Sequence, residues 1–142
     1  KYGKNIHAVG FGSHDFCSET GIKHTSEFIK PIKMQLNLIA KAFGIQVLDG
    51  VDVNVRETKT LIEECQCAFD MGMDGKFYIH PEQVSIASQI SYLTAQEKQR
   101  IKQVYEKYQN LESGDFDIIE VEGQVYEKPH INRVLKLMNK LK

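Results

Sequence analysis

The sequence has no long hydrophobic run and no excess of charge of either sign. No apolar stretch approaches the ~20 residues that a membrane-spanning helix needs, so we expect no membrane segment. Lysine and arginine together number 18, aspartate and glutamate together 19, and the net charge is −1. A chain so close to neutral has no field that would attract nucleic acid or an anionic membrane surface. We therefore expect neither as a partner.

Cysteine is also scarce, since the chain has Cys17, Cys65 and Cys67. An odd number without a disulfide spacing pattern favours a reducing, cytoplasmic location. Cys65 and Cys67 form a C-x-C pair, but residues two apart on a helix point in different directions. No further Cys or His lies near them at the spacing of a zinc finger. Buried thiols in a helix are therefore the better interpretation.

The length of 142 residues is close to that of one domain and is enough to bury one core. With 42% hydrophobic and 26% charged residues, the composition is that of a soluble globular protein. The first residues, Lys1 to Asn5, resemble neither a signal peptide nor a translation start. We therefore expect the front half of a longer protein to be absent from this sequence.

Residues 1–92 alternate short apolar runs with segments of helical periodicity. The apolar runs predict strands at Ile6–Gly12, Ile45–Gly50 and Gly75–His80. A polar loop is expected between the first strand and the first helix, over Ser13–Ser26. The resulting order β-α-β-α-β-α predicts parallel strands joined by right-handed crossovers.

Apolar stripes mark the inward faces of two predicted helices. The first helix stops at Gly44, and its stripe consists of Ile29, Ile32, Leu36, Ile39 and Phe43. The second runs from about Val55 to Gly72, and its inward residues are Leu61, Ile62, Cys65 and Phe69. Pro81 is expected in the first turn of a third helix, where proline is tolerated.

Residues 93–142 differ in character and predict an extension made of a helix, a hairpin and a second helix. Thr94–Glu97 is a capping box, and the helix it opens carries Ile101, Val104, Tyr105, Tyr108 and Leu111. Ser113–Asp115 is expected to break this helix, and Ile118–Tyr126 alternates as a hairpin around Glu122-Gly123. Pro129 is expected to separate the hairpin from a terminal helix with Ile131, Val134, Leu135, Met138 and Leu141.

Polar residues follow each predicted strand of the first part. Asp15 follows the first strand, Asp49 and Asp52 the second, and His80 the third. In α/β barrels the active site lies at these strand ends, and carboxylates there suit a hard cation such as magnesium. By position alone, however, an aspartate after a strand is more often a helix cap or a turn former. The strands are also apolar on both faces, and the first presents an unpaired edge, so a preceding strand is expected.

Three segments carry a resemblance to the citrate lyase β-subunit and malyl-CoA lyase family, within the HpcH/HpaI aldolase–citrate lyase superfamily. Gly10–Phe16, followed by Gly21, resembles the G-x-x-D segment after the sixth strand of that family. Asp49 is similar to the aspartate after the seventh strand. Met71–Gln83 is close to the signature G-x-D-G-K-x-x-I-H-P-x-Q around the eighth strand. The resemblance extends, in register, over nearly the whole chain.

The resemblance implies an α/β fold that is the C-terminal portion of a (β/α)8 TIM barrel. Strands six to eight would lie in residues 1–92, and residues 93–142 would form the C-terminal extension. Strands one to five would be absent. It follows that the family's substrate-gripping arginine and one of its two magnesium-binding carboxylates have no counterpart here.

Site residues implied by the resemblance are Asp15, as the other magnesium ligand, and Glu127, as the catalytic acid or base. Glu127 lies in Gly123–Pro129, which resembles the G-x-x-x-D-x-P segment that enters the active site of a neighbouring subunit in coenzyme-A-using relatives. Aspartate is replaced by glutamate here, and the added methylene displaces the carboxylate by about an ångström, which can cost on the order of 10²-fold in rate. His14 stands beside Asp15 where relatives often carry an acidic or small residue.

The implied activity is that of a Mg²⁺-dependent carbon–carbon lyase. It would cleave a citryl-, malyl- or citramalyl-type thioester, carried by coenzyme A or an acyl carrier, into a keto acid and an acetyl thioester. A homo-oligomer is implied, and the 142-residue chain alone is expected to be inactive. Asp49, Lys76 and His80 are expected near the substrate or cofactor, although a helix cap, a surface lysine and a structural histidine are the plainer interpretations.

Two other functions remain open at this point. The chain could belong to a non-catalytic relative that keeps the barrel for assembly or ligand sensing, with His14 and Glu127 as marks of lost activity. It could also belong to a class II aldolase that uses pyruvate without coenzyme A. The C-terminal extension argues against the aldolase, because a plain barrel does not need a further hairpin and helix.

Overall fold

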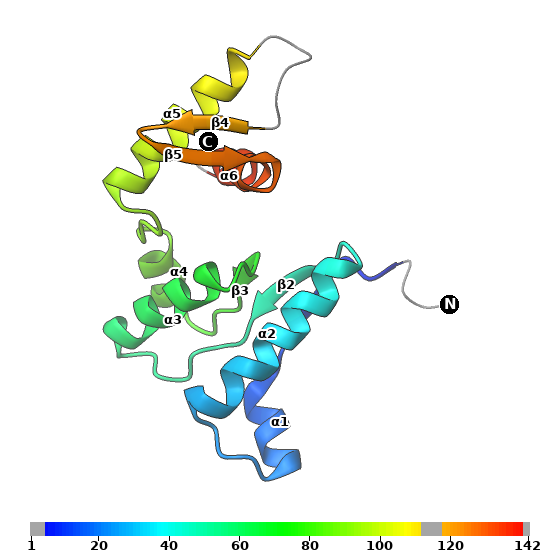
Figure 1. Ribbon diagram of the computed structural model, residues 1–142. Coiled ribbons are helices and arrows are strands. Elements are labelled where there is room, and N and C mark those ends of the chain that lie inside the picture. Colours follow the sequence, from blue (N-terminus) through cyan, green and yellow to red (C-terminus); the bar gives the residue numbers. More distant parts are fainter. Residues whose placement is uncertain (1–4, 112–117, 141–142) are drawn as a thin grey trace. The chain divides into compact units, whose positions relative to one another are not determined.

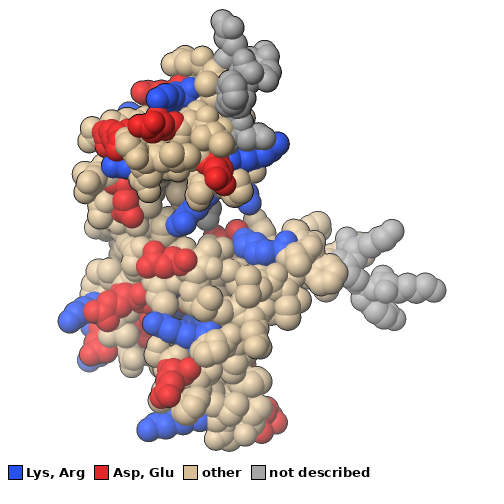
Figure 2. All heavy atoms as spheres, in the orientation of Figure 1, with Lys and Arg blue, Asp and Glu red and all other residues tan. Residues whose placement is uncertain are grey.

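The computed structural model describes residues 5–111 and 118–140, and the chain divides into two compact units, Lys1–Tyr92 and Leu93–Lys142 (Figure 1). The predicted helix break at Ser113–Asp115 lies outside the described residues. Figure 2 shows lysine and arginine intermixed with aspartate and glutamate on the visible face of each unit, in keeping with the net charge of −1. No helix in the described ranges is both long enough and apolar enough to span a membrane.

A parallel sheet forms the centre of the first unit. In its described residues the strands are β1 (Ala8–Gly10), β2 (Gln46–Asp49) and β3 (Gly75–Lys76), in the order β1-β2-β3. Ala8 pairs with Gln46, and Asp49 pairs with Lys76. The predicted parallel order is therefore confirmed, but every strand is shorter than predicted.

The prediction of a strand as far as His80 is wrong beyond Lys76. The Phe77 amide still donates to the Asp49 carbonyl, at 3.0 Å. Two residues later the Ile79 amide donates instead to Oε1 of Gln83, at 3.0 Å. Because a side chain takes over this amide, the chain leaves the sheet and turns into helix α4 (Pro81–Ala87). Pro81 lies in its first turn, as predicted.

Helices α2 (Ser26–Ala42) and α3 (Thr58–Asp70) contact the sheet, and the core between them consists of Ala40, Val47, Ala68 and Met73. Ile39, Phe43 and Ile62 were expected to face inward but are 59%, 77% and 40% exposed. The stripe prediction was therefore wrong at these positions.

The face that α2 buries is polar as well as apolar. Asn37, on the buried side of α2, donates from Nδ2 to the Met71 carbonyl at 2.6 Å, and Lys33 forms an ion pair with Asp49. These partners lie on other elements, so hydrophobic periodicity alone could not show which side of the helix turns inward.

The predicted polar loop at Ser13–Ser26 contains a helix, α1 (Ser13–Thr20), which is a correction to the sequence prediction. Asp15 lies in its first turn, where a negative charge is favourable. Gly21 ends the helix in the left-handed conformation, with φ of 72°, and its amide donates to the Cys17 carbonyl. This helix is short and mostly polar, so hydrophobic periodicity did not reveal it.

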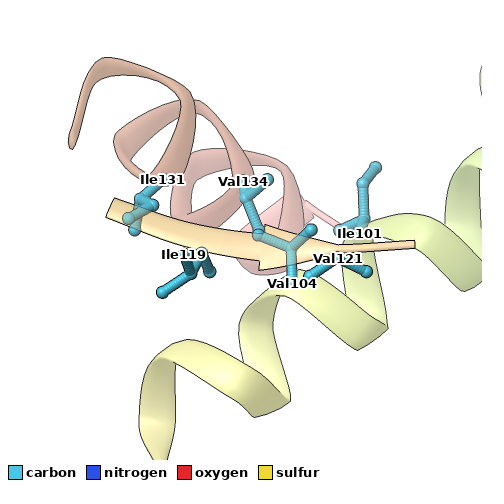
Figure 3. Close-up of a cluster of buried hydrophobic side chains, with 6 residues drawn as sticks. All are labelled: Ile101, Val104, Ile119, Val121, Ile131 and Val134. Carbon is cyan, nitrogen blue, oxygen red and sulfur yellow. The ribbon is translucent and has the colours of Figure 1, made fainter. Parts of the chain in front are cut away.

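The second unit contains α5 (Ala95–Gln109), the antiparallel hairpin of β4 (Ile118–Val121) and β5 (Gln124–Glu127), and α6 (Lys128–Lys140). Glu122 and Gly123 both have positive φ, 50° and 76°, as a two-residue turn between twisted strands requires. Figure 3 shows the core, to which α5, β4 and α6 contribute Ile101, Val104, Ile119, Val121, Ile131 and Val134.

The predicted helix, hairpin and helix of this unit are confirmed, with one correction. Pro129 does not separate the hairpin from the last helix, because it is the second residue of α6. A proline fits there because the amides of the first turn have no partner within the helix. Leu141, which was expected on the inner face of this helix, lies outside the described residues.

The capping box of α5 gives a first prediction. Thr94 Oγ1 accepts from the Glu97 amide at 3.2 Å, and Glu97 Oε2 accepts from the Thr94 amide at 2.8 Å. Thr94→Ala is expected to lower the free energy of unfolding by about 1 kcal/mol, because it leaves a helix-end amide without its partner. Urea unfolding followed by circular dichroism measures the loss. Thr60→Ala, at an exposed hydroxyl in α3, should cost less, and equal losses would contradict the capping role.

Candidate active site

An open pocket of about 480 Å³ lies at the carboxyl ends of β1 and β2. Its walls are the turn from β1 into α1, the loop after β2, and one side chain that follows β3. The lining residues are Gly10, Phe11, Gly12, Ser13, His14, Asp15, Gly50, Val51, Val53 and Phe77. The carboxyl edge of parallel strands is where α/β proteins commonly place ligands.

Two glycines let the walls of this pocket approach closely. A Cβ at Gly50 would lie 2.8 Å from the Phe11 carbonyl oxygen, which is backbone. A Cβ at Gly10 would lie 2.4 Å from Cε2 of Phe77, which is the end of a half-exposed side chain. The contact at Gly50 therefore fixes how closely the loop after β2 can approach the β1–α1 turn.

Asp15 is the carboxylate of this pocket. It is exposed, and a Cβ at Gly12 would lie 3.3 Å from its Oδ2, so the small residue leaves room around that oxygen. In the described residues no group of three or more His, Cys, Asp and Glu side chains is arranged to hold a metal. Magnesium needs only one or two carboxylates, because waters and substrate oxygens complete its shell. Asp15 fits such an ion as one ligand, in a set that the described residues do not complete.

Ser13 and two histidines lie beside Asp15. Ser13 begins α1 and is buried, with its Oγ 2.9 Å from Nε2 of His24, a residue of the loop between α1 and α2. The rings of His14 and His24 stack, with centroids 4.0 Å apart and planes 7° apart. The sequence had drawn attention to His14, whereas the link from His24 to Ser13 was not foreseen.

Asp49 and Lys76 belong to a buried ion cluster on the side of the sheet that α2 and α3 cover. Asp49 alternates with buried Val47 on β2, so both side chains point to that side. Asp49 contacts Nζ of Lys33 at 2.6 Å and Nζ of Lys76 at 3.2 Å. Lys76 Nζ also lies 2.8 Å from Oε2 of Glu64 and donates to the Gly50 carbonyl at 2.6 Å.

The Lys76 ammonium is held in its charged form. Burial by itself would lower the pKa of Lys76, but the hydrogen bond to Glu64 and the charge of Asp49 outweigh burial and raise it. Lys76 is therefore a fixed cation at neutral pH rather than a base. Neither Asp49 nor Lys76 lines the pocket that holds Asp15.

The H-P-x-Q segment, His80–Gln83, stabilises the turn that leads from β3 into α4. His80 is the N-cap of α4, and its Nδ1 accepts from the Glu82 amide at 3.2 Å. The buried Gln83 accepts from the Ile79 amide and donates from Nε2 to the Asp52 carbonyl at 2.9 Å. It thereby ties α4 to the loop after β2. Gln83 is the last residue of the signature segment Met71–Gln83, and no role was predicted for it from the sequence.

A match to a known sequence family shows which family this chain belongs to. The sequence model of the family described as HpcH/HpaI aldolase/citrate lyase matches residues 3–81, which is more than half of the chain. The chain belongs to this family. The resemblance inferred from the sequence is thereby confirmed.

This HpcH/HpaI family member is similar to two relatives of known name and to one solved structure. It is 29% identical over 125 residues to a (3S)-malyl-CoA thioesterase of Cereibacter sphaeroides, covering 84% of this chain and 43% of the relative. It is 27% identical over 130 residues to the human mitochondrial citramalyl-CoA lyase, covering 87% and 37%. Its fold matches the crystal structure of CitE from Mycobacterium tuberculosis in complex with magnesium, acetoacetate and coenzyme A. That match has a TM-score of 0.75 at 19% identity and covers 92% of this chain and 50% of CitE.

The HpcH/HpaI chain spans less than half the length of these two relatives. Its α/β fold is that of the citrate lyase-like structures. Of the residues predicted for the site, Asp15 lines the pocket, whereas Asp49, Lys76 and His80 do not. Lys76 approaches it only through its hydrogen bond to the carbonyl of Gly50, which is a lining residue. The position of Asp49, Lys76 and His80 next to a substrate stays a prediction.

Glu127 lies in the other unit of this family member, at the end of β5. It is exposed, and its backbone amide donates to Nδ1 of His130 at 3.2 Å. The His130 ring meets Tyr126 edge to face, with centroids 6.4 Å apart. These contacts hold the backbone at Glu127 and leave its carboxylate exposed.

Proposed function

We propose that this chain forms the C-terminal part of a carbon–carbon lyase that cleaves a citryl-, malyl- or citramalyl-type acyl thioester. The products are a keto acid and an acetyl thioester. The observation that carries the proposal is Asp15, an exposed carboxylate in an open pocket at the carboxyl ends of parallel strands, within a segment that matches the lyase family. A relative named citramalyl-CoA lyase and a neighbour crystallised with acetoacetate and coenzyme A support it.

In this proposal β1, β2 and β3 are strands six to eight of a (β/α)8 barrel, and residues 93–142 are the extension. The side of the sheet that carries Leu48 and Phe77 then faces the barrel interior. Half-exposed Phe77 supports this arrangement, since a side chain of that size is usually covered. The unpaired edge of β1 is consistent with a further parallel strand beside it.

Magnesium is the proposed cofactor, and Asp15 is the residue of this chain that would hold it. When bound, the ion would act as a Lewis acid toward the carboxylate and the adjacent oxygen of the keto acid. Asp15 orients that end of the substrate, and the glycine-lined walls bring the backbone close to it. Glu127 of a neighbouring subunit moves the proton at the enolate carbon of the acetyl thioester, a contribution of typically 10²–10⁴-fold. The proposal therefore includes a homo-oligomer.

The test is a calorimetric titration of Mg²⁺ into the chain with and without acetoacetate. We expect weak binding that acetoacetate strengthens, and we expect Asp15→Asn to weaken it by on the order of tenfold or more, because the carboxylate charge is lost. Glu19→Gln, which removes an exposed acid at the other end of α1, is the matched control and should change nothing.

Two results would count against the proposal. Magnesium affinity that is unchanged in Asp15→Asn would remove the metal role and favour a non-catalytic relative that binds ligands or assembles. Magnesium-dependent release of a keto acid by the 142-residue chain alone would contradict the view that further ligands are needed.

A further inference from the structure

Another open pocket, of about 670 Å³, lies between α2 and α3 and shares no lining residue with the pocket that holds Asp15. Three of its lining residues carry sulfur, namely Met34 on α2, Cys67 on α3 and Met71 at the C-terminal end of α3. The whole chain has only four methionines and three cysteines. Nearly half of its sulfur atoms therefore belong to residues that line one pocket.

Hydrogen bonds of the backbone and of Asn37 bring these three residues together. The Met71 amide donates to the Cys67 carbonyl at 3.0 Å, so the two residues are one helical turn apart, with Cβ atoms about 5–6 Å from each other. Asn37 of α2 donates from Nδ2 to the Met71 carbonyl at 2.6 Å. Met34 lies three residues before Asn37 and is its neighbour on the surface of α2. The Asn37 bond therefore holds Met34 across the pocket from Cys67 and Met71.

The two thiols of the C-x-C pair have different surroundings. Cys65 is 3% exposed, and its Sγ lies 3.7 Å from the hydroxyl of Tyr78. Cys67 is a free cysteine that is only partly buried and that lines the pocket. Residues two apart on a helix point in different directions, so Cys67 reaches the pocket without Cys65. The sulfur set of the pocket is therefore one thiol and two thioethers.

The chemistry of this set selects a soft metal ion. Thiolate and thioether sulfurs favour Cu(I), whereas magnesium prefers oxygen and structural zinc needs four ligands from cysteine, histidine or carboxylates. In the residues that the structure describes, no group of three or more His, Cys, Asp and Glu side chains could hold a metal. Glu63 and Asp70 also line the pocket and outnumber its one basic residue, Lys30, so the local charge favours a cation.

We propose that Met34, Cys67 and Met71 form a three-sulfur site for one Cu(I) ion. The Cys67 thiol gives up its proton when the ion binds, and the thiolate then neutralises the charge of the ion. The flexible methionine side chains turn their sulfurs inward to complete the shell, and the ion links α2 to α3. The site shares no residue with the proposed lyase site, so the two can be tested apart.

The first measurement is a competition between the chain and bicinchoninate for Cu(I), under anaerobic conditions with ascorbate as the reductant. We expect one equivalent of Cu(I) to be retained. Cys67→Ser should lower the affinity by at least about 10²-fold, because even a change beyond the direct ligands costs about 10–100-fold. Met34→Leu and Met71→Leu, which keep the side-chain volume nearly constant, should each lower it by at least about tenfold, the lower end of that range.

Cys17→Ser and Met138→Leu are the matched controls. Cys17 is the other partly buried free cysteine and Met138 is a partly buried methionine, and neither lines this pocket. Both variants should keep the Cu(I) affinity of the unsubstituted chain. A loss in Cys17→Ser as large as that in Cys67→Ser would mean that Cu(I) binds to any accessible thiol, which contradicts the proposal.

X-ray absorption at the copper edge of the unsubstituted chain tests the ligand set without any substitution. We expect three sulfur neighbours and no nitrogen or oxygen neighbour. A copper ion with fewer than three sulfur neighbours, or an affinity that both methionine variants leave unchanged, would overturn the proposal. Sulfur atoms that serve only to pack α2 against α3 would give no retained copper at all. Magnesium binding is read in a separate titration, so failure of the lyase proposal leaves this result interpretable.

Discussion

An Asp49→Asn variant is expected to lose about 3–5 kcal/mol of unfolding free energy, the usual cost of removing one partner from a buried ion pair. Asp49 is 1% exposed and is the shared counter-charge of Lys33 and Lys76. Its loss leaves two ammonium groups with little solvent access and less opposite charge. Small domains are stable by only about 5–15 kcal/mol, so much of the stability would disappear.

Urea unfolding followed by circular dichroism at neutral pH measures this loss. The exposed pair of Lys59 and Glu63, 3.8 Å apart, supplies a matched control. Glu63→Gln should cost at most about 0.5 kcal/mol, because water solvates both of these charges well. Similar losses for Asp49→Asn and Glu63→Gln would show that the buried cluster does not stabilise the fold.

The pKa of Lys76 sets the pH range for this experiment. Because its folded-state pKa is raised above the ordinary 10.5, the contribution of Lys76 is complete below that value and is lost only as the pH rises above it. The expected loss at neutral pH therefore does not depend on titration of this lysine. The double variant Asp49→Asn/Lys76→Met should lose less unfolding free energy than the two single variants lose together, since the residues are in contact.

A Gly50→Ala substitution is expected to lower the free energy of unfolding by about 1–3 kcal/mol, the range found when atoms are forced into a packed site. The new methyl group would lie 2.8 Å from the Phe11 carbonyl oxygen, and a backbone atom can move only if the β1–α1 turn moves with it. Because that turn carries Ser13 and Asp15, the pocket should be distorted as well as destabilised.

Gly10→Ala is the matched comparison for Gly50→Ala. The clash there is nominally worse, at 2.4 Å, but it is with the end of the Phe77 ring, which is 46% exposed and can rotate away. We therefore expect Gly10→Ala to lower the free energy of unfolding by less than Gly50→Ala does, although its contact is the shorter of the two. Urea unfolding of both variants measures the two losses of unfolding free energy. A larger loss for Gly10→Ala would mean that the ring is held more firmly than its exposure indicates.

Much of the fold followed from local patterns in the sequence. Periodicity predicted the parallel strands and the helices between them, and Thr94 with Glu97 marked the start of α5. The helix α1 was missed because its residues are mostly polar and its end depends on the conformation of Gly21. The inner side of α2 was misplaced because Lys33 and Asn37 turn inward to partners far away in the sequence.

The candidate site was predicted less completely than the fold. Asp15 could be found because a carboxylate after a strand combines with a recognisable motif. The Ser13–His24 pair could not, since nothing local to either residue indicates that a loop folds back onto the start of α1. The roles of Gln83 and Asp49 likewise depend on contacts between segments that are distant in the chain.

The register of the strands also has a consequence for the order of folding. The hairpin of the second unit closes through a two-residue turn, so its contacts are local and can form early. In the first unit Ala8 meets Gln46 only after α1 and α2 have been traversed, and such long-range pairing forms slowly. The pocket is built across the ends of β1 and β2. It therefore belongs to the late-forming part of the molecule, and substitutions that slow strand pairing will delay the appearance of the site itself.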